Sequence, residues 1–99
     1  MTEEQGSGAT ALEVFISGRV QGVGYRSWCV ETATALGLSG WVRNRLSGGV
    51  EAVFSGDERA VKAMIAQCGE GPKWCWVSRV KVVREVEPLD GPFRLKTSA

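Results

Sequence analysis

The order in which two hydrophobic periodicities follow one another constrains the fold of this chain more than any other feature. Segments in which apolar and polar residues alternate predict strands, and segments with apolar residues three or four positions apart predict helices. The patterns predict, in order, a strand at 12–16, a helix at 26–36, strands at 38–45 and 50–55, a helix from Asp57 to Gly69, a strand at 77–84 and a short final strand at 93–96. The order β-α-β-β-α-β plus that final strand predicts an α+β fold, the ferredoxin-like split βαβ sandwich, with two helices on one face of a mainly antiparallel sheet.

Individual residues mark the ends and the buried faces of these segments. Gly37 follows the first predicted helix, where glycine commonly ends a helix, and Asp57 is a typical N-cap for the second. Ser47-Gly48-Gly49 predicts a tight hairpin between the two middle strands, because glycine accepts the positive φ that such turns need. Cys29 and Cys68 lie on the apolar stripes of the helices, which indicates core positions rather than nucleophiles.

Chain length indicates one domain. A chain of 99 residues can bury one hydrophobic core but is too short for two. We predict a single domain over residues 11–99. Residues 1–10 are small and polar, with Gly6 and Gly8, and are predicted to form a flexible N-terminal tail.

Composition excludes several kinds of function. The formal net charge of +1 gives no electrostatic case for a nucleic acid or a membrane as partner, and no apolar stretch is long enough to span a membrane. The absence of histidine excludes a histidine base, a Ser-His or Cys-His pair and histidine metal ligands. The cysteines, Cys29, Cys68 and Cys75, are odd in number and widely spaced, which argues against a disulfide framework or a zinc site. With the polar N-terminus, these features favour a cytoplasmic protein without a metal or another cofactor.

A glycine-rich segment joins the first predicted strand to the first predicted helix, and it reads Gly18-Arg19-Val20-Gln21-Gly22-Val23-Gly24-Tyr25-Arg26. Its glycines let the backbone fold tightly and bring several N–H groups to one point. The loop leads into a helix N-terminus, whose unpaired N–H groups and dipole favour an anion. Arg26 adds a permanent charge and a planar fork of donors at the same place. The segment therefore predicts a site for phosphate or another tetrahedral oxyanion.

Two segments resemble the paired signatures of the acylphosphatases. The first is this loop, which ends in Arg26, and the second, on the second predicted strand, is Gly40-Trp41-Val42-Arg43-Asn44. The similarity continues through Gly49-Val50-Glu51 and covers nearly the whole chain beyond the first ten residues. A glycine-rich loop alone is a weak signal, but the arginine at its end and the second segment on the expected strand make the match specific.

The resemblance implies hydrolysis of a carboxyl–phosphate anhydride to a carboxylate and inorganic phosphate. Arg26 matches the phosphate-binding arginine of the family, and Asn44 matches the asparagine that orients the attacking water. The same phosphate would be surrounded by the backbone amides of the loop, Gln21, Gly22, Val23, Gly24, Tyr25 and Arg26. We therefore expect a small-molecule acyl phosphate as substrate, phosphate or sulfate as an occupant of the loop, no metal, no nucleic acid or membrane partner, and a monomer.

Elementary chemistry is consistent with those roles. An acyl phosphate carries a good leaving group, so catalysis requires positioning and charge stabilisation rather than a strong general acid. Fixed backbone donors and a guanidinium stabilise charge without reorganising during the reaction. Asn44 offers an acceptor and a donor that can position water without acting as a base, and a phosphate oxygen of the substrate could accept the proton of that water. This hypothesis gives a histidine-free chain a route to hydrolysis without a metal or a covalent intermediate.

Each of these residues also has a purely structural interpretation. The glycines could form only a tight turn, and Asn44 could be a turn residue at the end of a strand. Arg19, Arg43 and Arg45 are predicted to be solvated surface charges. The tryptophans are more typical of packing or rim positions than of ligands.

Two other classes of function remain open at this point. A ferredoxin-like sheet can bind RNA by stacking bases on exposed aromatic residues, and Phe15 and Phe54 lie in mid-strand, although the basic-aromatic strand motif of RNA recognition is absent. The second alternative is a phosphate-binding regulatory module without turnover. Pure binding would not need a water-orienting residue such as Asn44.

Three features depart from the family pattern. Tyr25 stands where phenylalanine is common, which adds a hydroxyl near the predicted site. After Gly71-Pro72 the chain carries Trp74 and Trp76, which could alter packing or the acyl end of the pocket. Residues 97–99 extend past the usual family end, so a contact between the terminal carboxylate and Arg26 is not expected.

Overall fold

A computed structural model describes residues 9–99 and contains five strands and two helices in the predicted order. The predicted tail falls largely on residues 1–8, which lie outside the described residues. The elements are β1 (Ala9–Arg19), α1 (Tyr25–Ala35), β2 (Ser39–Asn44), β3 (Val50–Asp57), α2 (Glu58–Glu70), β4 (Trp76–Glu85) and β5 (Arg94–Leu95).

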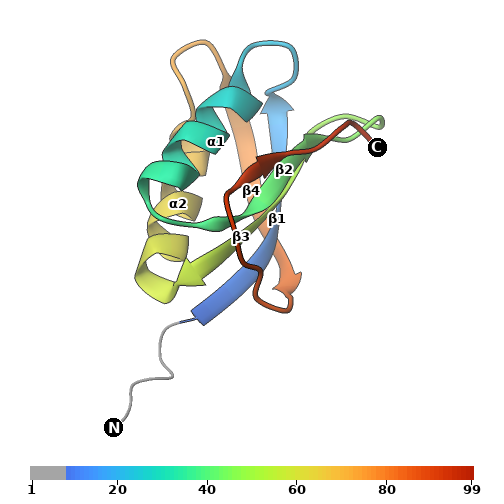
Figure 1. Ribbon diagram of the computed structural model, residues 1–99. Helices are drawn as coiled ribbons and strands as arrows, with labels where there is room; N and C mark the ends of the chain where they lie inside the picture. Colours follow the sequence, from blue (N-terminus) through green and yellow to red (C-terminus); the bar gives the residue numbers. More distant parts are fainter. Residues whose placement is uncertain (1–8) are drawn as a thin grey trace, which may run out of the picture.

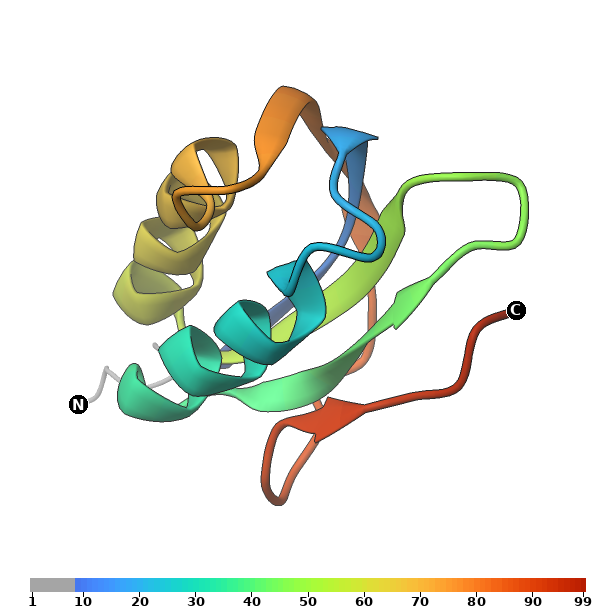
Figure 2. The same cartoon turned by 90° about the horizontal axis from the view of Figure 1, so that it is seen from above.

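The strands form one sheet in the order β4-β1-β3-β2-β5. All neighbours are antiparallel except β2 and β5, which pair in parallel at one edge. Both helices cover the same face of the sheet (Figures 1 and 2). The predicted ferredoxin-like α+β sandwich is therefore confirmed. Residues 9–99 contain two helices, α1 and α2. Neither is long and apolar enough to cross a membrane.

The core lies between the sheet and the two helices. Alternate residues of the central strands face the helices, because successive side chains of a strand point to opposite faces. The fully buried strand side chains include Val14 and Ile16 of β1 and Phe54 of β3. They meet helix residues spaced three or four positions apart, namely Cys29, Ala33, Val61, Met64 and Cys68. Cys29 and Cys68 are thus core residues, as the helical stripes predicted.

Several element boundaries differ from the predictions, and two of the differences have a clear physical reason. β1 begins at Ala9, inside the predicted tail, because its first residues pair with the far end of β3, Ala9 opposite Asp57. α2 does not end at Gly69 but continues to Glu70. Gly71 ends it instead, since this glycine adopts a φ of 65° and its N–H donates to the carbonyl of Gln67 at 2.9 Å.

The other face of the sheet carries charged side chains. Glu51 is 13 % exposed and accepts hydrogen bonds from Arg43 Nε at 2.9 Å and Arg45 Nη1 at 3.2 Å. Burial alone would raise the pKa of Glu51, but the hydrogen bond and the charge of Arg43, with a hydrogen bond from Arg45, lower that pKa. Arg43, whose side chain is 23 % exposed, is therefore less solvated than predicted, whereas the side chain of Arg45 is 40 % exposed, as expected of a surface charge.

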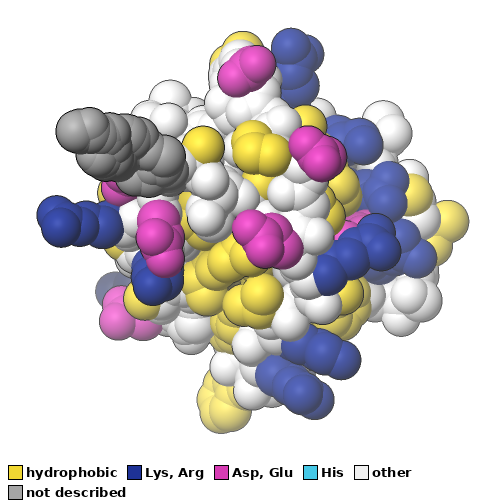
Figure 3. Space-filling view, turned by 90° about the horizontal axis from the view of Figure 1, so that it is seen from below, with side chains coloured by type: hydrophobic (Ala, Val, Ile, Leu, Met, Phe, Trp, Pro, Cys, Tyr) yellow, Lys and Arg dark blue, Asp and Glu magenta, His cyan; other side chains and the backbone are white. Residues whose placement is uncertain are grey.

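The space-filling view shows where the basic side chains gather. Lys and Arg side chains gather mainly on the right of Figure 3, away from the helices, which lie on the left of Figure 1. Phe15 lies half-buried on this open face, whereas Phe54 is fully buried on the helix face. Because these two rings lie on opposite faces of the sheet, they cannot form the stacking surface that the RNA alternative needs.

Strand direction brings two distant segments to one end of the sheet. β1 and β2 are both antiparallel to β3, so they run in the same direction, and the segments that follow them lie at the same end. These segments are the β1–α1 loop and the β2–β3 hairpin (Figures 1 and 2).

Candidate active site

The β1–α1 loop ends at a helix N-terminus that no side chain caps. Gly22 and Gly24 have φ values of 75° and 89°, which only glycine adopts readily, and Gly24 is the N-cap of α1. Its backbone is left-handed, and no side chain of residues 9–99 forms a capping hydrogen bond at this end of the helix. The first N–H groups of α1 therefore remain available to a bound anion.

A small cavity of about 90 Å³ lies at this N-terminus. Four of the six predicted loop residues line it, namely Gly22, Gly24, Tyr25 and Arg26. Gln21 and Val23 do not line it. Three lining residues were absent from the prediction, Val20, Ser27 and Leu95.

Arg26 occupies the first turn of α1, where the helix dipole favours negative charge. Its side chain is partly buried and lines the cavity. Among residues 9–99, no carboxylate forms an ion pair with it. The Arg26 guanidinium thus keeps its donors for a ligand.

Asn44 is the last residue of β2 and lies on the same face as the buried Val42, two positions earlier. Its side-chain oxygen Oδ1 is buried and has no hydrogen-bond partner within residues 9–99. A buried acceptor without a partner is rare and calls for an explanation, such as a water that binds there. Asn44 does not line the small cavity itself.

The side chain of Gln21 joins the loop to the hairpin that follows Asn44. Its Nε2 donates to the carbonyl of Arg45 at 2.8 Å and to the carbonyl of Gly49 at 2.7 Å. The sequence predicted only a backbone role for Gln21 in the phosphate-binding loop. In the structure, the side chain of Gln21 also links the loop to the residues that follow β2.

The side chain of Tyr25 is buried and bonds to α2. Its ring is buried, and its hydroxyl donates to the carbonyl of Cys68 on α2 at 2.8 Å. Burial, with the nearby Cys68, raises the pKa of this hydroxyl, so it stays protonated. This hydroxyl, in which the chain departs from the family pattern, therefore anchors α1 to α2.

β5 and the residues after it reach the cavity and the end of β2, which the sequence did not predict. Leu95 lines the small cavity because β5 pairs in parallel with β2, Val42 opposite Leu95. Farther along, the N–H of Ala99 donates to the carbonyl of Asn44 at 3.1 Å, and the carbonyl of Ala99 accepts from Leu46 at 2.7 Å. Ala99 thus contacts the backbone around Asn44.

No described group of side chains resembles a metal site. In the part of the chain from 9 to 99, no three His, Cys, Asp or Glu side chains lie close enough together to hold an ion. The donors at the candidate site are the loop amides, one guanidinium and one amide side chain. These groups suit an oxyanion better than a cation.

The fold and the loop together define a ferredoxin-like α+β domain with a candidate oxyanion site at a helix N-terminus. The sequence model of the family named Acylphosphatase matches residues 12–94, and the chain belongs to this family. The protein is therefore a hydrolase that acts on acyl phosphates, small molecules in which phosphate is joined to a carboxyl group.

Individual relatives match over most of their length. The acylphosphatase of Rhodospirillum rubrum is 52 % identical over 87 residues, which cover 88 % of this chain and 96 % of the relative. The acylphosphatase of Rhodopseudomonas palustris is 58 % identical over 79 residues, which cover 79 % of this chain and 77 % of the relative. The structure of an acylphosphatase from Coxiella burnetii superimposes with a TM-score of 0.86 at 34 % identity and covers 97 % of this chain and 100 % of its own.

Proposed function

We propose that Arg26 and the backbone amides from Gln21 to Arg26 hold the phosphate of the acyl phosphate, and that Asn44 orients the attacking water. The observation that carries this assignment is the buried Oδ1 of Asn44, which has no partner within residues 9–99. A water that donates a hydrogen bond to this oxygen would give it a partner and would be held in one orientation.

The proposed reaction needs one displacement at phosphorus. The oriented water attacks phosphorus opposite the acyl oxygen, the bond from phosphorus to that oxygen breaks, and the carboxylate leaves with the bonding electrons. The proton of the water passes to a phosphate oxygen of the substrate. A carboxylate is a weak base, with a pKa of about 4, so it leaves without a general acid. The route uses no covalent intermediate and no metal.

The charge of Arg26 and the dipole of α1 act on the transferred phosphoryl group. During in-line attack, negative charge is spread over the three phosphoryl oxygens. The guanidinium and the first N–H groups of α1 are already in place, so they stabilise this charge without reorganising. Gln21 supports the assignment because its two hydrogen bonds hold the loop beside the segment that carries Asn44.

We further propose that the protein works as a cytoplasmic monomer whose loop also binds inorganic phosphate or sulfate. The loop, Asn44 and Leu95 come from a single chain, so the site needs no second copy. Cys29, Cys68 and Cys75 are free thiols, which suits a reducing compartment. Light scattering on the purified protein tests the monomer, competitive inhibition by inorganic phosphate and by sulfate tests the loop, and fractionation of the producing cells tests the compartment.

The mechanism is tested by hydrolysis of acetyl phosphate in the presence of a metal chelator. We expect the unmodified protein to turn over at an undiminished rate, because no step uses a metal. Arg26→Ala and Asn44→Ala should each lower kcat about 100-fold or more, as expected for the loss of one preorganised group. Arg26→Ala should also raise KM and weaken inhibition by phosphate, whereas Asn44→Ala should change mainly kcat.

Arg59→Ala serves as the control for loss of a positive charge. Arg59 is exposed on α2, away from the loop, and its replacement should leave kcat and KM unchanged. Thermal unfolding of each variant shows whether it is folded. A folded Asn44→Ala variant with the kcat of the unmodified protein would overturn the role assigned to Asn44, and loss of turnover on chelation would overturn the metal-free mechanism.

A further inference from the structure

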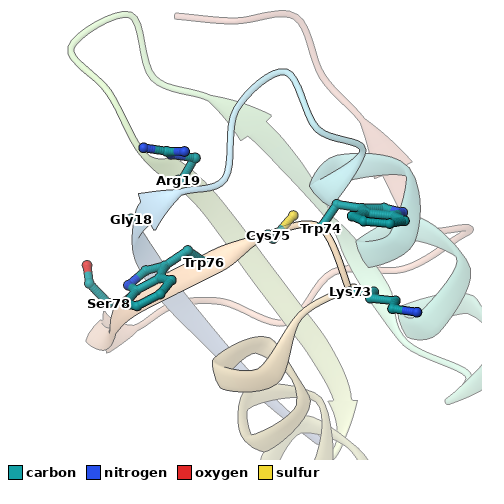
Figure 4. Close-up of a pocket in the computed structure, with 7 residues that line it drawn as sticks. All are labelled: Gly18, Arg19, Lys73, Trp74, Cys75, Trp76 and Ser78. Atoms are coloured by element: carbon teal, nitrogen blue, oxygen red, sulfur yellow. The ribbon is translucent and has the colours of Figure 1, made fainter.

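A second and larger hollow lies beside the β1–α1 loop. Its volume is about 760 Å³, and Gly18 and Arg19 of β1 form one wall. The opposite wall comes from the α2–β4 connection and the start of β4, with Trp74, Trp76 and Lys73 (Figure 4). The small cavity at the α1 N-terminus begins one residue after Arg19, at Val20, and shares no lining residue with this groove.

Two exposed indole rings dominate the groove. Trp74 is 75 % exposed and Trp76 is 72 % exposed, so neither contributes to the core. The ammonium group of Lys73 lies 5.6 Å from the centre of the Trp74 ring. Figure 4 shows the two rings on either side of Cys75, one on the connection and one on β4. Ligand sites are typically concave and lined by aromatic side chains, and exposed apolar patches rimmed by polar groups mark such sites.

The backbone of β1 makes this arrangement possible. Pairing with β4 shifts register between Ser17 and Gly18, and Arg19 then lies opposite Trp76. Gly18 has a φ of 126°, and a Cβ at this position would lie 2.2 Å from the carbonyl oxygen of Trp76. Only glycine therefore allows the start of β4 to approach β1 so closely, and this bulge fixes the direction of the Trp76 side chain.

The charges at the groove have one sign. Among the described residues that line it, Arg19 and Lys73 are cationic and none is acidic. Indole rings stack on planar aromatic groups, and a lysine or arginine beside them binds a phosphate or carboxylate. The volume lies within the range typical of sites for small molecules.

We propose that this groove binds a planar aromatic molecule that carries a phosphate or a carboxylate and is about the size of a mononucleotide. Trp74 and Trp76 stack on its aromatic ring, while Lys73 and Arg19 bind its anionic group. The site is independent of the catalytic assignment, since it uses neither Arg26 nor Asn44.

The test uses the full chain labelled with ¹⁵N and adenosine monophosphate as the probe. Each tryptophan gives one indole N–H signal, so the protein reports on Trp28, Trp41, Trp74 and Trp76 separately. We expect saturable shifts of the Trp74 and Trp76 signals and none at Trp28 and Trp41. Trp74→Ala and Trp76→Ala should each weaken binding by about 5-fold to 100-fold, as found when a stacked base loses its aromatic partner, without changing acetyl phosphate hydrolysis. Trp41→Ala is the matched control and should leave the affinity unchanged.

Three results would overturn the proposal. The first is the absence of saturable shifts at millimolar adenosine monophosphate. The second is binding of adenosine as tight as that of the monophosphate, which would show that Lys73 and Arg19 do not bind the anionic group. The third is loss of binding in Arg26→Ala, which would place the probe at the α1 N-terminus and leave the catalytic assignment standing.

Discussion

Replacing Gln21 by alanine tests whether the loop must be held against the hairpin for catalysis. The variant loses two hydrogen bonds, from Nε2 to the carbonyls of Arg45 and Gly49. Neither carbonyl is orphaned, because Gly48 N–H still donates to Arg45 and Arg45 N–H still donates to Gly49. At about 0.5–1 kcal/mol for each exposed bond, the free energy of unfolding should fall by about 1–2 kcal/mol. The unfolding temperature should fall by roughly 5–10 °C.

The lower stability alone should not change kcat at temperatures where the variant is folded. We nevertheless expect kcat to fall. Without Gln21 the loop can move relative to Asn44, so the bound phosphate and the oriented water lose their alignment. A loss of about 1.4 kcal/mol of transition-state stabilisation corresponds to a tenfold lower rate, and we expect kcat to fall by about that factor. KM should change less, because Arg26 and the first N–H groups of α1 still bind the phosphate. Steady-state hydrolysis of acetyl phosphate, measured well below the unfolding temperature, gives both constants.

Two further variants make the experiment decisive. Gln67→Ala removes an exposed glutamine from α2 and should leave kcat unchanged. Gln21→Glu keeps the size of the side chain but replaces the donor with a carboxylate that repels both carbonyls, so its kcat should fall at least as far as that of Gln21→Ala. If Gln21→Ala is less stable but turns over as fast as the unmodified protein, the two hydrogen bonds serve stability alone and the alignment argument is refuted.

Three other substitutions follow from particular contacts. Tyr25→Phe removes the hydrogen bond to the carbonyl of Cys68 and should lower the free energy of unfolding by about 1–2 kcal/mol in urea titration, with kcat nearly unchanged. The pKa of Glu51 is lowered from its ordinary value of 4.5, so its ionised form stabilises the fold above that pH, and the stabilisation is lost as the pH falls through the lowered pKa. Melting temperatures of Glu51→Gln should therefore vary less with pH below 4.5 than those of the unmodified protein. Gly49→Ala, whose new Cβ would lie 2.5 Å from the Phe15 ring, should cost roughly 1–3 kcal/mol more than Gly48→Ala, where the space is open.

Much of the fold could be predicted because its elements are locally encoded. The alternation of apolar residues around Phe54 and the three-to-four spacing of Val61, Met64 and Cys68 each depend only on nearby residues. The loop could be predicted for the same reason, since glycine and the first turn of a helix act over a few positions. The family was predicted from two short segments, and the family model over residues 12–94 confirmed it.

The parts that could not be predicted depend on pairing between distant segments. Leu95 reaches the cavity only because β5 pairs in parallel with β2, and no turn residue signals a parallel pair. The hydroxyl of Tyr25 bonds to a carbonyl 43 positions away, so its direction is set by the packing of α1 on α2. The strand that begins at Ala9 is likewise stabilised by a partner at Asp57 rather than by its own alternation.

The sheet and a single side chain bring the two family segments to the same end of the molecule. β1 and β2 run in the same direction with β3 between them, so the loop and Asn44 lie at the same end of the sheet. Strand pairing alone does not fix their distance, since the last pair between β1 and β3 is Ile16 with Val50, before the loop begins. Gln21 supplies the missing restraint by bonding across the gap to the carbonyl of Gly49. A change in the hairpin that moves this carbonyl is therefore expected to disturb the loop as well, although the two lie far apart in the sequence.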